Sequence, residues 1–339
     1  MAIKGLVRQV ISRAVRPYGY EIVDRDALYD WQQPMPAPVQ PGRAPLPDGA
    51  AASLADDHPR LQELRARYAA CDGKVTTPFV WTNDLVSGDH LRWFRGDHAY
   101  VWQLRGPNMN PLGYALTTYY VKAIDTLGLL DRLTDDNLFG NITFQVDNRA
   151  VSRDLLDSLI EIYFLDRHLK LASLAGPRIL DIGAGYGRLA HRVTEGLDNV
   201  AEYVCVDGVA ASTFISEYYL KFRKCERAVV IPLDQIDSAL AGRSIDVAVN
   251  VHSFSECRLE AVDWWLSLLE RHRVRYLMIV PNAGREHGGR SLATNDGHDF
   301  GPLIERHGYR LVVREPKYRD PVVAEFGINP TYHYLFELS

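Results

Sequence analysis

Short apolar runs alternate with amphipathic segments through the C-terminal half of the chain. The apolar runs predict seven strands, at residues 178–182, 202–206, 228–232, 245–250, 275–280, 309–314 and 332–338. Segments with helical periodicity lie between them, at 187–196, 210–223, 234–241, 256–272 and 300–307. Strands separated by helices indicate an α/β fold with a parallel sheet. Only a loop separates the last two strands, which favours an antiparallel C-terminal hairpin at the sheet edge.

The N-terminal half has a different pattern, with many aromatic and arginine residues and weaker periodicity. Helical spacing is present at 59–70 and 114–131, and a strong amphipathic helix is predicted for 153–172 with Ser152 as its N-cap. Six prolines between residues 33 and 50 predict an extended linker. The predicted organisation is a basic amphipathic N-terminal helix at 1–32, a proline-rich linker at 33–58, a mainly helical accessory region at 59–150 and the sheet domain at 151–339.

The composition is that of an ordinary globular protein, with 47% hydrophobic and 24% charged residues among 339. The net charge of −5 gives no reason to expect a nucleic acid partner. No run approaches the roughly 18 apolar residues that a membrane span needs. The four cysteines are far apart and form no Cys-x-x-Cys pair. We therefore expect reduced thiols and a cytoplasmic location.

Residues 1–16 differ from the rest, because Lys4, Arg8, Arg13 and Arg16 are interleaved with aliphatic residues and no acid. The segment lacks the continuous apolar core of a signal peptide. The favoured interpretation is a helix that packs on the body of the protein or on a partner, such as the second subunit of a homodimer. The alternative is a peripheral contact of residues 1–17 with an anionic membrane surface.

Residues 178–191 hold the most informative motif of the chain. The first predicted strand is followed by Gly183, Gly185 and Gly187 and then by a helical pattern. This order indicates a strand, a tight turn and a helix start. Glycines let the backbone turn sharply, so a ligand can lie against them and Ala184 and face the first N–H groups of the helix. Dinucleotide-binding enzymes use such a turn too, so the motif alone indicates only a nucleotide-like ligand.

Acidic residues at the strand ends add to this motif, because ligands of such sheets bind across the carboxyl ends of the strands. Asp181 precedes the glycines by two residues, and Asp207 ends the second strand 20 residues after Gly187. That spacing is typical of an acid that accepts both ribose hydroxyls. The expected cofactor set is completed at the ends of the second, third and fourth strands by Gly208, Asp234 and Asn250. Asp234 has an equal alternative as the N-cap of a helix at 235–241.

The fourth strand runs into the segment 251–256, Val-His-Ser-Phe-Ser-Glu, where we expect the reaction chemistry. His252 is the candidate general base, since an ordinary histidine pKa of about 6.5 suits proton removal near neutrality. Glu256 is a second candidate for the catalytic site. It also fits a capping box with Ser253 that would open helix 256–272. We favour this structural role, with Glu256 also able to orient His252.

Substrate contacts are expected at two places. Asn282 precedes a glycine-rich loop at 284–299 that contains His287 and His298 and would overhang the site. Arg153 begins the helix 153–172, whereas for Asp157, one turn later, a solvated helix face is favoured. The histidines and acids of the loop could bind a divalent metal such as magnesium, but their spacing matches no ligand pattern. A mobile polar lid is the favoured interpretation.

The glycine motif with its preceding acid resembles the first motif of class I S-adenosylmethionine-dependent methyltransferases. The resemblance implies a Rossmann-like sheet of seven strands. It also implies S-adenosylmethionine as cofactor, with Asp181 near its methionine portion, Asp207 at its ribose and Asp234 near its adenine.

Further segments are similar to the sugar O-methyltransferases of bacterial glycan gene clusters, a group that is similar to mycobacterial mannoside methyltransferases. The matching segments are Leu138–Gly140, Val151–Ser158, Glu161–Leu165, Ile182–Arg188 and Val251–Glu256. This narrower likeness covers roughly residues 90–339. It implies that the methyl acceptor is a saccharide hydroxyl.

Two other functions stay open at this point. One is a methyltransferase that acts on an oxygen or nitrogen of a small natural product, with the same cofactor site. The other is a cofactor-binding scaffold without turnover. The Asn/Asp-Pro-Pro-aromatic motif typical of enzymes that methylate nucleobase amino groups is missing after the fourth strand. The sequence therefore excludes that class.

Overall fold

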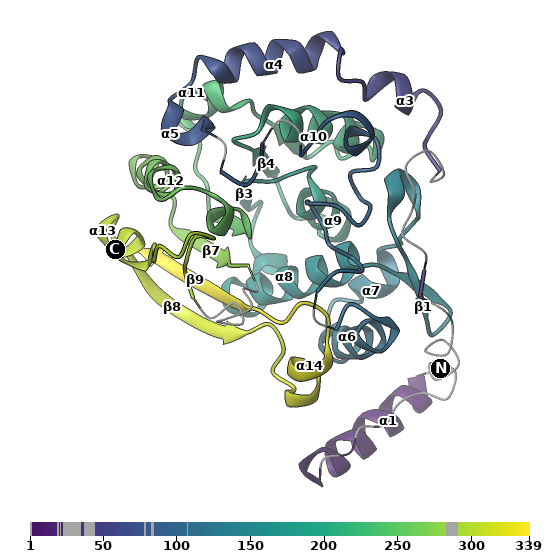
Figure 1. Ribbon diagram of the computed structural model, residues 1–339. Coiled ribbons are helices and arrows are strands. Elements are labelled where there is room, and N and C mark those ends of the chain that lie inside the picture. The colour runs from purple at the N-terminus through teal and green to yellow at the C-terminus, as the bar shows by residue number, and fades with distance from the viewer. Residues whose placement is uncertain are drawn as a thin grey trace.

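A seven-stranded mixed sheet forms the centre of the computed structural model (Figure 1). The structure describes residues 2–18, 20, 22, 35–36, 45–77, 79–82, 85–106, 108–282 and 291–339. The strands of the sheet are β3 (Arg178–Ile182), β4 (Glu202–Val206), β5 (Ala228–Val230), β6 (Val247–Val251), β7 (Tyr276–Val280), β8 (Tyr309–Pro316) and β9 (Tyr332–Leu338). Their order across the sheet is β5-β4-β3-β6-β7-β9-β8. The predicted α/β class and all seven predicted strands are confirmed.

The order of the strands reverses at β3, which pairs in parallel with both β4 and β6. Such a reversal opens a crevice at the carboxyl ends of the central strands. β9 is antiparallel to β7 and to β8, so it lies inside the sheet and β8 forms the edge. The predicted antiparallel pair is therefore confirmed. The loop predicted between its strands is wrong, because helix α14 (Pro321–Phe326) lies there, its first turn capped by the Asp320 carboxylate.

Helices connect the parallel strands. They are α9 (Arg188–Gly196), α10 (Ala210–Phe222), α11 (Ile236–Leu240), α12 (Leu259–Arg271) and α13 (Gly301–Arg306), and α8 (Arg153–Leu169) precedes β3. The Ser152 hydroxyl accepts a hydrogen bond from the N–H of Leu155, which confirms the predicted N-cap of α8. The helix predicted at 256–272 starts three residues later. A 3₁₀ turn, η6 (Ser253–Glu256), precedes it instead of a capping box.

The accessory region contains helices α3 (Ala50–Ser53), α4 (Pro59–Ala69), α5 (Gly73–Thr76), α6 (Pro111–Ile124) and α7 (Leu129–Arg132) and the 3₁₀ helices η2 (Gly88–Leu91) and η3 (Leu138–Gly140). A hairpin that the sequence did not reveal, β1 (Phe144–Val146) with β2 (Arg149–Val151), follows them. The helix predicted at 114–131 is split into α6 and α7, because the Asp125 carboxylate accepts the N–H groups of Leu129 and Leu130.

The accessory helices pack against the sheet domain. α4 packs on α10, α5 on α12, and α6 on both α8 and α14. Ala50 and Leu54 are buried in the same hydrophobic core as the strands, although they lie within the segment 33–58. The domain boundaries themselves stay predictions. The N-terminal helix α1 (Ala2–Val15) and the 3₁₀ turn η1 (Arg16–Tyr18) lie apart from this core, at the lower right of Figure 1.

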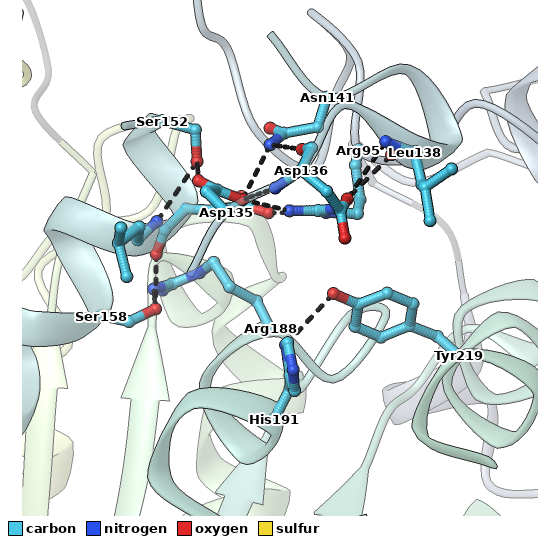
Figure 2. Close-up of polar contacts among 12 residues, drawn as sticks. Arg95, Asp135, Asp136, Leu138, Asn141, Ser152, Ser158, Arg188, His191 and Tyr219 are labelled. Atoms are coloured by element: carbon cyan, nitrogen blue, oxygen red, sulfur yellow. Dashed lines mark hydrogen bonds and ion pairs between the residues drawn. The ribbon is translucent and has the colours of Figure 1, made fainter. Parts of the chain in front are cut away.

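A buried arginine joins the accessory region to the sheet domain (Figure 2). The Arg95 side chain is 0% exposed and forms ion pairs with Asp135 at 2.8 Å, Asp136 at 2.6 Å and Asp154 at 3.1 Å. Asp154 belongs to the first turn of α8, whereas the other two acids precede the β1–β2 hairpin. Because a buried charge is costly unless it is paired, Arg95 fixes the position of α8 relative to the accessory region.

The acids around Arg95 have further cationic and polar partners. Arg192 of α9 lies 3.1 Å from Asp135, and Arg223 at the end of α10 lies 2.6 Å from Asp136. Asn141 donates to Asp135 at 3.0 Å, and the Ser152 hydroxyl donates to it as well. The network therefore connects three helices of the sheet domain to the residues before the hairpin.

Replacing Arg95 with methionine is expected to lower the free energy of unfolding by about 3–5 kcal/mol, because the buried Asp154 then loses its ion pair and Asp135 and Asp136 keep only Arg192 and Arg223. Urea denaturation measures this loss. Arg132→Met is the control, since Arg132 pairs with Asp198 at 3.4 Å while their side chains are 49% and 86% exposed. It should cost less than about 1 kcal/mol. Equal losses in the two variants would contradict the role given to Arg95.

Candidate functional site

A cleft of about 1280 Å³ lies at the carboxyl ends of β3, β4 and β6. Its floor includes the glycine turn after β3 and the residues that end β4. The opposite wall comes from the accessory region, through residues 75–77, 79–81 and 97–102. The site is thus formed between two parts of the chain that are far apart in sequence. Its position is the one that the strand order predicts for a ligand.

The glycine turn needs its glycines for both conformation and space. Gly183, Gly185 and Gly187 have φ angles of 73°, 58° and 86°, values that residues with a Cβ rarely adopt. A Cβ on Gly183 would lie 2.1 Å from the Ser253 hydroxyl oxygen, and one on Gly185 would lie 3.1 Å from the Tyr100 ring. The turn therefore lets residues of η6 and of the accessory region approach the backbone closely.

Asp207 connects the end of β4 to the glycine turn. Its carboxylate accepts the N–H of Gly185 at 2.9 Å and the N–H of Val209 at 2.8 Å. Burial raises the pKa of Asp207 to about 7 despite these two hydrogen bonds. Asp207 also lines the cleft, and a carboxylate has about four acceptor positions. A ligand with hydroxyl donors can therefore complete its hydrogen bonding.

Asp181 is the second buried acid on the cleft floor. The Tyr203 hydroxyl donates a hydrogen bond of 2.9 Å to its carboxylate. Burial raises the pKa of Asp181 to about 7. Nearby, Arg188 pairs with Glu161 at 2.9 Å and donates to the Ser158 hydroxyl at 2.7 Å, as Figure 2 shows for Ser158. The cleft floor therefore combines an ion-paired arginine with an acid that lacks a cation of its own among the described residues.

Of four other residues in the expected cofactor set, two line the cleft and two do not. Gly208 and Ala184 line the cleft as expected, but the described lining does not include Asn250 or Asp234. Asn250 donates to the carbonyl of Ile182 at 2.9 Å and accepts the N–H of Phe254 at 3.0 Å. It therefore holds the ends of β3 and β6 together.

Asp234 lies near the surface and forms an ion pair with Arg67 of α4 at 2.8 Å. The N-cap alternative for this residue is wrong, because Asp234 lies in the 3₁₀ turn η5 (Leu233–Gln235) and the N-cap position of α11 is Gln235. Its carboxylate serves to attach the accessory helix α4 to the end of β5.

His252 lines the cleft directly after β6. It has a φ of 67°, and its N–H donates to the carbonyl of Val280 at 2.7 Å. A positive φ at a residue other than glycine is strained and is found preferentially at functional sites. Nδ1 is buried without a hydrogen-bond partner among the described residues. Burial, followed by the positive charge of Arg153, lowers the pKa of His252 to about 3, so the ring is neutral at physiological pH.

Glu256 faces the cleft, so its predicted capping role is wrong. The reason is that the Ser253 hydroxyl contacts the carbonyl of Ile182 at 3.2 Å instead of opening a helix. The Glu256 carboxylate accepts the Trp81 indole N–H at 2.5 Å and the Asn282 amide at 3.0 Å. Burial raises its pKa. Asn282, a predicted substrate contact, therefore lines the cleft together with Glu256.

Arg153 lies at the cleft as predicted, but its surroundings were not foreseen. It donates to Asp157 at 2.9 Å and to the carbonyl of Trp102 at 2.9 Å. Lys317, which is buried, donates to the other Asp157 oxygen at 2.6 Å. The solvated helix face expected for Asp157 is therefore wrong. Burial opposes its ionisation, but Lys317 and Arg153 hold the pKa of Asp157 well below its usual range.

The loop after β7 contributes little to the described site. His298 is 62% exposed and lies 3.7 Å from Asp296, and it is not among the described lining residues. Asn295 does line the cleft, and its N–H donates to the carbonyl of Ser255 at 2.7 Å. His287 lies outside the described residues. Among the residues that are described, no group of three His, Cys, Asp or Glu side chains could hold a metal ion.

No protein-family model and no curated protein matches the chain. Solved structures similar to it include a SAM-dependent methyltransferase from Aquifex aeolicus, with 15% identity, 51% of this chain and 89% of that chain covered, and a TM-score of 0.39. Magnesium protoporphyrin IX methyltransferase from Synechocystis with bound SAM has 14% identity, 66% and 97% coverage, and a TM-score of 0.39. The mitomycin 7-O-methyltransferase MmcR has 15% identity, 54% and 57% coverage, and a TM-score of 0.37.

Replacing Asp181 with asparagine is expected to stabilise the protein at high pH. The pKa of about 7 in the folded state exceeds the ordinary value of about 3.9. Asp181 therefore contributes stability below about pH 4 that is lost as the pH rises through about 7. At pH 8, Asp181→Asn should raise the free energy of unfolding by up to about 4 kcal/mol.

Urea denaturation at pH 5 and pH 8 measures this effect, which should be larger at pH 8. Asp198→Asn is the control, because the Asp198 side chain is 86% exposed and should show no such pH dependence. An asparagine variant that is equally destabilised at both pH values would show that the buried charge of Asp181 carries no cost.

Proposed function

We propose that this protein is an S-adenosylmethionine-dependent O-methyltransferase that acts on a hydroxyl of a saccharide or glycan precursor. The observation that carries the proposal is the pair of buried acids, Asp181 and Asp207, beside the glycine turn at the reversal of strand order. The narrower resemblance to sugar O-methyltransferases in segments 151–165 and 251–256 supports the choice of acceptor.

The two acids fit the cofactor chemically. Each is desolvated, and burial raises the pKa of each to about 7, so each gains from a ligand that brings hydrogen-bond donors or positive charge. Asp207 would accept hydrogen bonds from the ribose hydroxyls, and Asp181 would face the amino group. Gly183, Gly185 and Gly208 provide backbone that a ligand can approach. When bound, S-adenosylmethionine supplies a methyl group activated on a sulfonium.

The cleft lining also offers polar and aromatic groups for an acceptor. Trp102 is 51% exposed and lines the cleft, where its ring can stack on the apolar face of a sugar. Arg153, Asn282 and Glu256 supply hydrogen bonds for hydroxyl groups. These residues hold the acceptor in one orientation, which supplies much of the acceleration for transfer to an in-line nucleophile.

His252 takes the proton that the acceptor hydroxyl loses. Its imidazole is neutral, with a pKa lowered to about 3 by burial, and Nδ1 is unpartnered among the described residues. A ring with so low a pKa is a weak base in the free protein. Asp157 favours the charged ring, but burial and Arg153 outweigh it. Above about pH 4 the ring is therefore in the unprotonated form that a general base requires.

The affinity for S-adenosylhomocysteine is expected to fall as the pH falls from 8 to 6. With pKa values of about 7 for Asp181 and Asp207, each ionised fraction drops about tenfold over this range. The dissociation constant measured by calorimetry should therefore rise about tenfold, or more if both carboxylates are required.

Asp207→Asn should weaken binding at pH 8 by at least about tenfold, because the ribose loses a charged acceptor. Asp234→Asn is the matched control, since Asp234 pairs with Arg67 away from the cleft, and it should bind as the wild type does. Absence of binding by the wild-type protein at pH 8 would refute the proposed cofactor.

His252→Asn is expected to lower kcat by about 10²–10⁴, the usual contribution of a positioned base. Asparagine tolerates the positive φ of this position, so S-adenosylhomocysteine affinity should be unchanged. The assay is a panel of glycan acceptors with labelled S-adenosylmethionine, with and without magnesium. His298→Asn, at an exposed site, is the control.

Two results would redirect the proposal. A His252→Asn variant that binds cofactor and turns over at the wild-type rate would exclude His252 as the base. Cofactor binding without turnover of any glycan, but with turnover of aromatic hydroxyl or amine acceptors, would favour the small-molecule alternative. Binding without any turnover would favour a scaffold.

A further inference from the structure

Three aliphatic residues of the N-terminal helix α1 are exposed, whereas a polar residue of the same helix is covered. Val7, Val10 and Ile11 are 51%, 62% and 43% exposed, whereas Ser12 is only 8% exposed. With 100° between successive residues, positions 7, 10 and 11 lie on one face of the helix and position 12 lies away from its centre. Helices of water-soluble proteins show the reverse arrangement. The exposed face of α1 is therefore suited to an apolar environment.

The charge of residues 1–16 indicates which apolar environment α1 would contact. The first 16 residues contain four basic residues and no acidic one, in a chain whose net charge is −5. Basic residues close to a membrane contribute about 1 kcal/mol each to binding an anionic lipid surface. Two tyrosines lie within five residues of the end of the helix, and Tyr18 and Tyr20 are 78% and 69% exposed. Tyrosine rings prefer the interface between headgroups and acyl chains.

The length of α1 determines whether it could span a bilayer or only lie at its surface. It has 14 residues, which extend about 21 Å at 1.5 Å per residue, less than the roughly 30 Å of a hydrocarbon core. Among the residues that the structure describes, no helix is long and apolar enough to cross a membrane. A short basic amphipathic helix with an exposed apolar face lies in the plane of the interface.

We infer that α1, with Tyr18 and Tyr20, binds the surface of an anionic phospholipid membrane. The aliphatic face of α1 inserts among the acyl chains near the headgroups, and the basic residues neutralise the lipid charge. A second copy of the chain fits less well, because it would bring two basic segments together without any acid between them. The inference is independent of the proposed enzymatic function.

The test is flotation of the full-length protein with vesicles. We expect binding to phosphatidylcholine vesicles that contain about 30 mol% phosphatidylglycerol, weaker binding to pure phosphatidylcholine, and release as NaCl rises from about 0.1 M to about 0.5 M. The double substitution Val10→Asp, Ile11→Asp should reduce binding at least about tenfold, because it removes aliphatic contact and adds negative charge.

The double substitution Leu311→Asp, Val312→Asp is the matched control. Leu311 and Val312 are 53% and 48% exposed on the edge strand β8, so this variant should bind vesicles as the wild type does. Circular dichroism and the unfolding midpoint confirm that both variants are folded. Arg13→Glu should weaken binding to the vesicles that contain phosphatidylglycerol and leave binding to pure phosphatidylcholine vesicles unchanged.

Three results would overturn the inference. The first is no preference of the wild type for anionic vesicles, and the second is unchanged binding of the Val10→Asp, Ile11→Asp variant. The third is a dimer in light scattering that this variant converts to a monomer, because the exposed face of α1 would then be covered by a second copy. Vesicle binding and cofactor binding are measured separately, so failure of one leaves the other intact.

Discussion

The buried guanidinium of Arg95 is the interaction on which the arrangement of the two parts of the chain depends. It forms ion pairs with three carboxylates inside the protein, and one of these, Asp154, belongs to the first turn of α8. The first two turns of α8 also contribute Arg153 and Asp157 to the cleft. Because an unpaired charge in this position would cost several kcal/mol, the ion pairs hold the accessory region against the sheet. The cleft exists only in that arrangement, since its opposite wall comes from the accessory region.

Two buried carboxylates of the cleft are less well stabilised than those paired with Arg95. Asp181 and Asp207 are buried, and the raised pKa of each shows that its ionised form is poorly stabilised in the absence of a ligand. His252 adds a strained backbone conformation and an unpartnered ring nitrogen. Functional sites commonly retain such costs, which a bound ligand offsets.

The features that were predicted correctly are those that depend on residues close together in the sequence. The strand β3, the glycine turn and the N-cap Ser152 were predicted correctly because each depends on residues adjacent in the chain. Asp234 looked equivalent to Asp207, as both follow a strand, yet it pairs with Arg67 from α4. Glu256 matched a capping box, but the Ser253 hydroxyl contacts the end of β3. In both cases a partner far away in sequence decided the role of the side chain.

The sequence by itself determined the α/β class, the seven strands, the turn and the position of the two buried acids, because periodicity and glycine spacing act over a few residues. Only the tertiary structure decided that β9 lies between β7 and β8, that Arg95 is buried, and that Trp81 reaches Glu256 across 175 positions of the chain. Those features depend on which distant surfaces meet, and on the burial that sets the pKa of each acid. A pattern of neighbouring residues in the sequence predicts neither the meeting of distant surfaces nor the resulting burial.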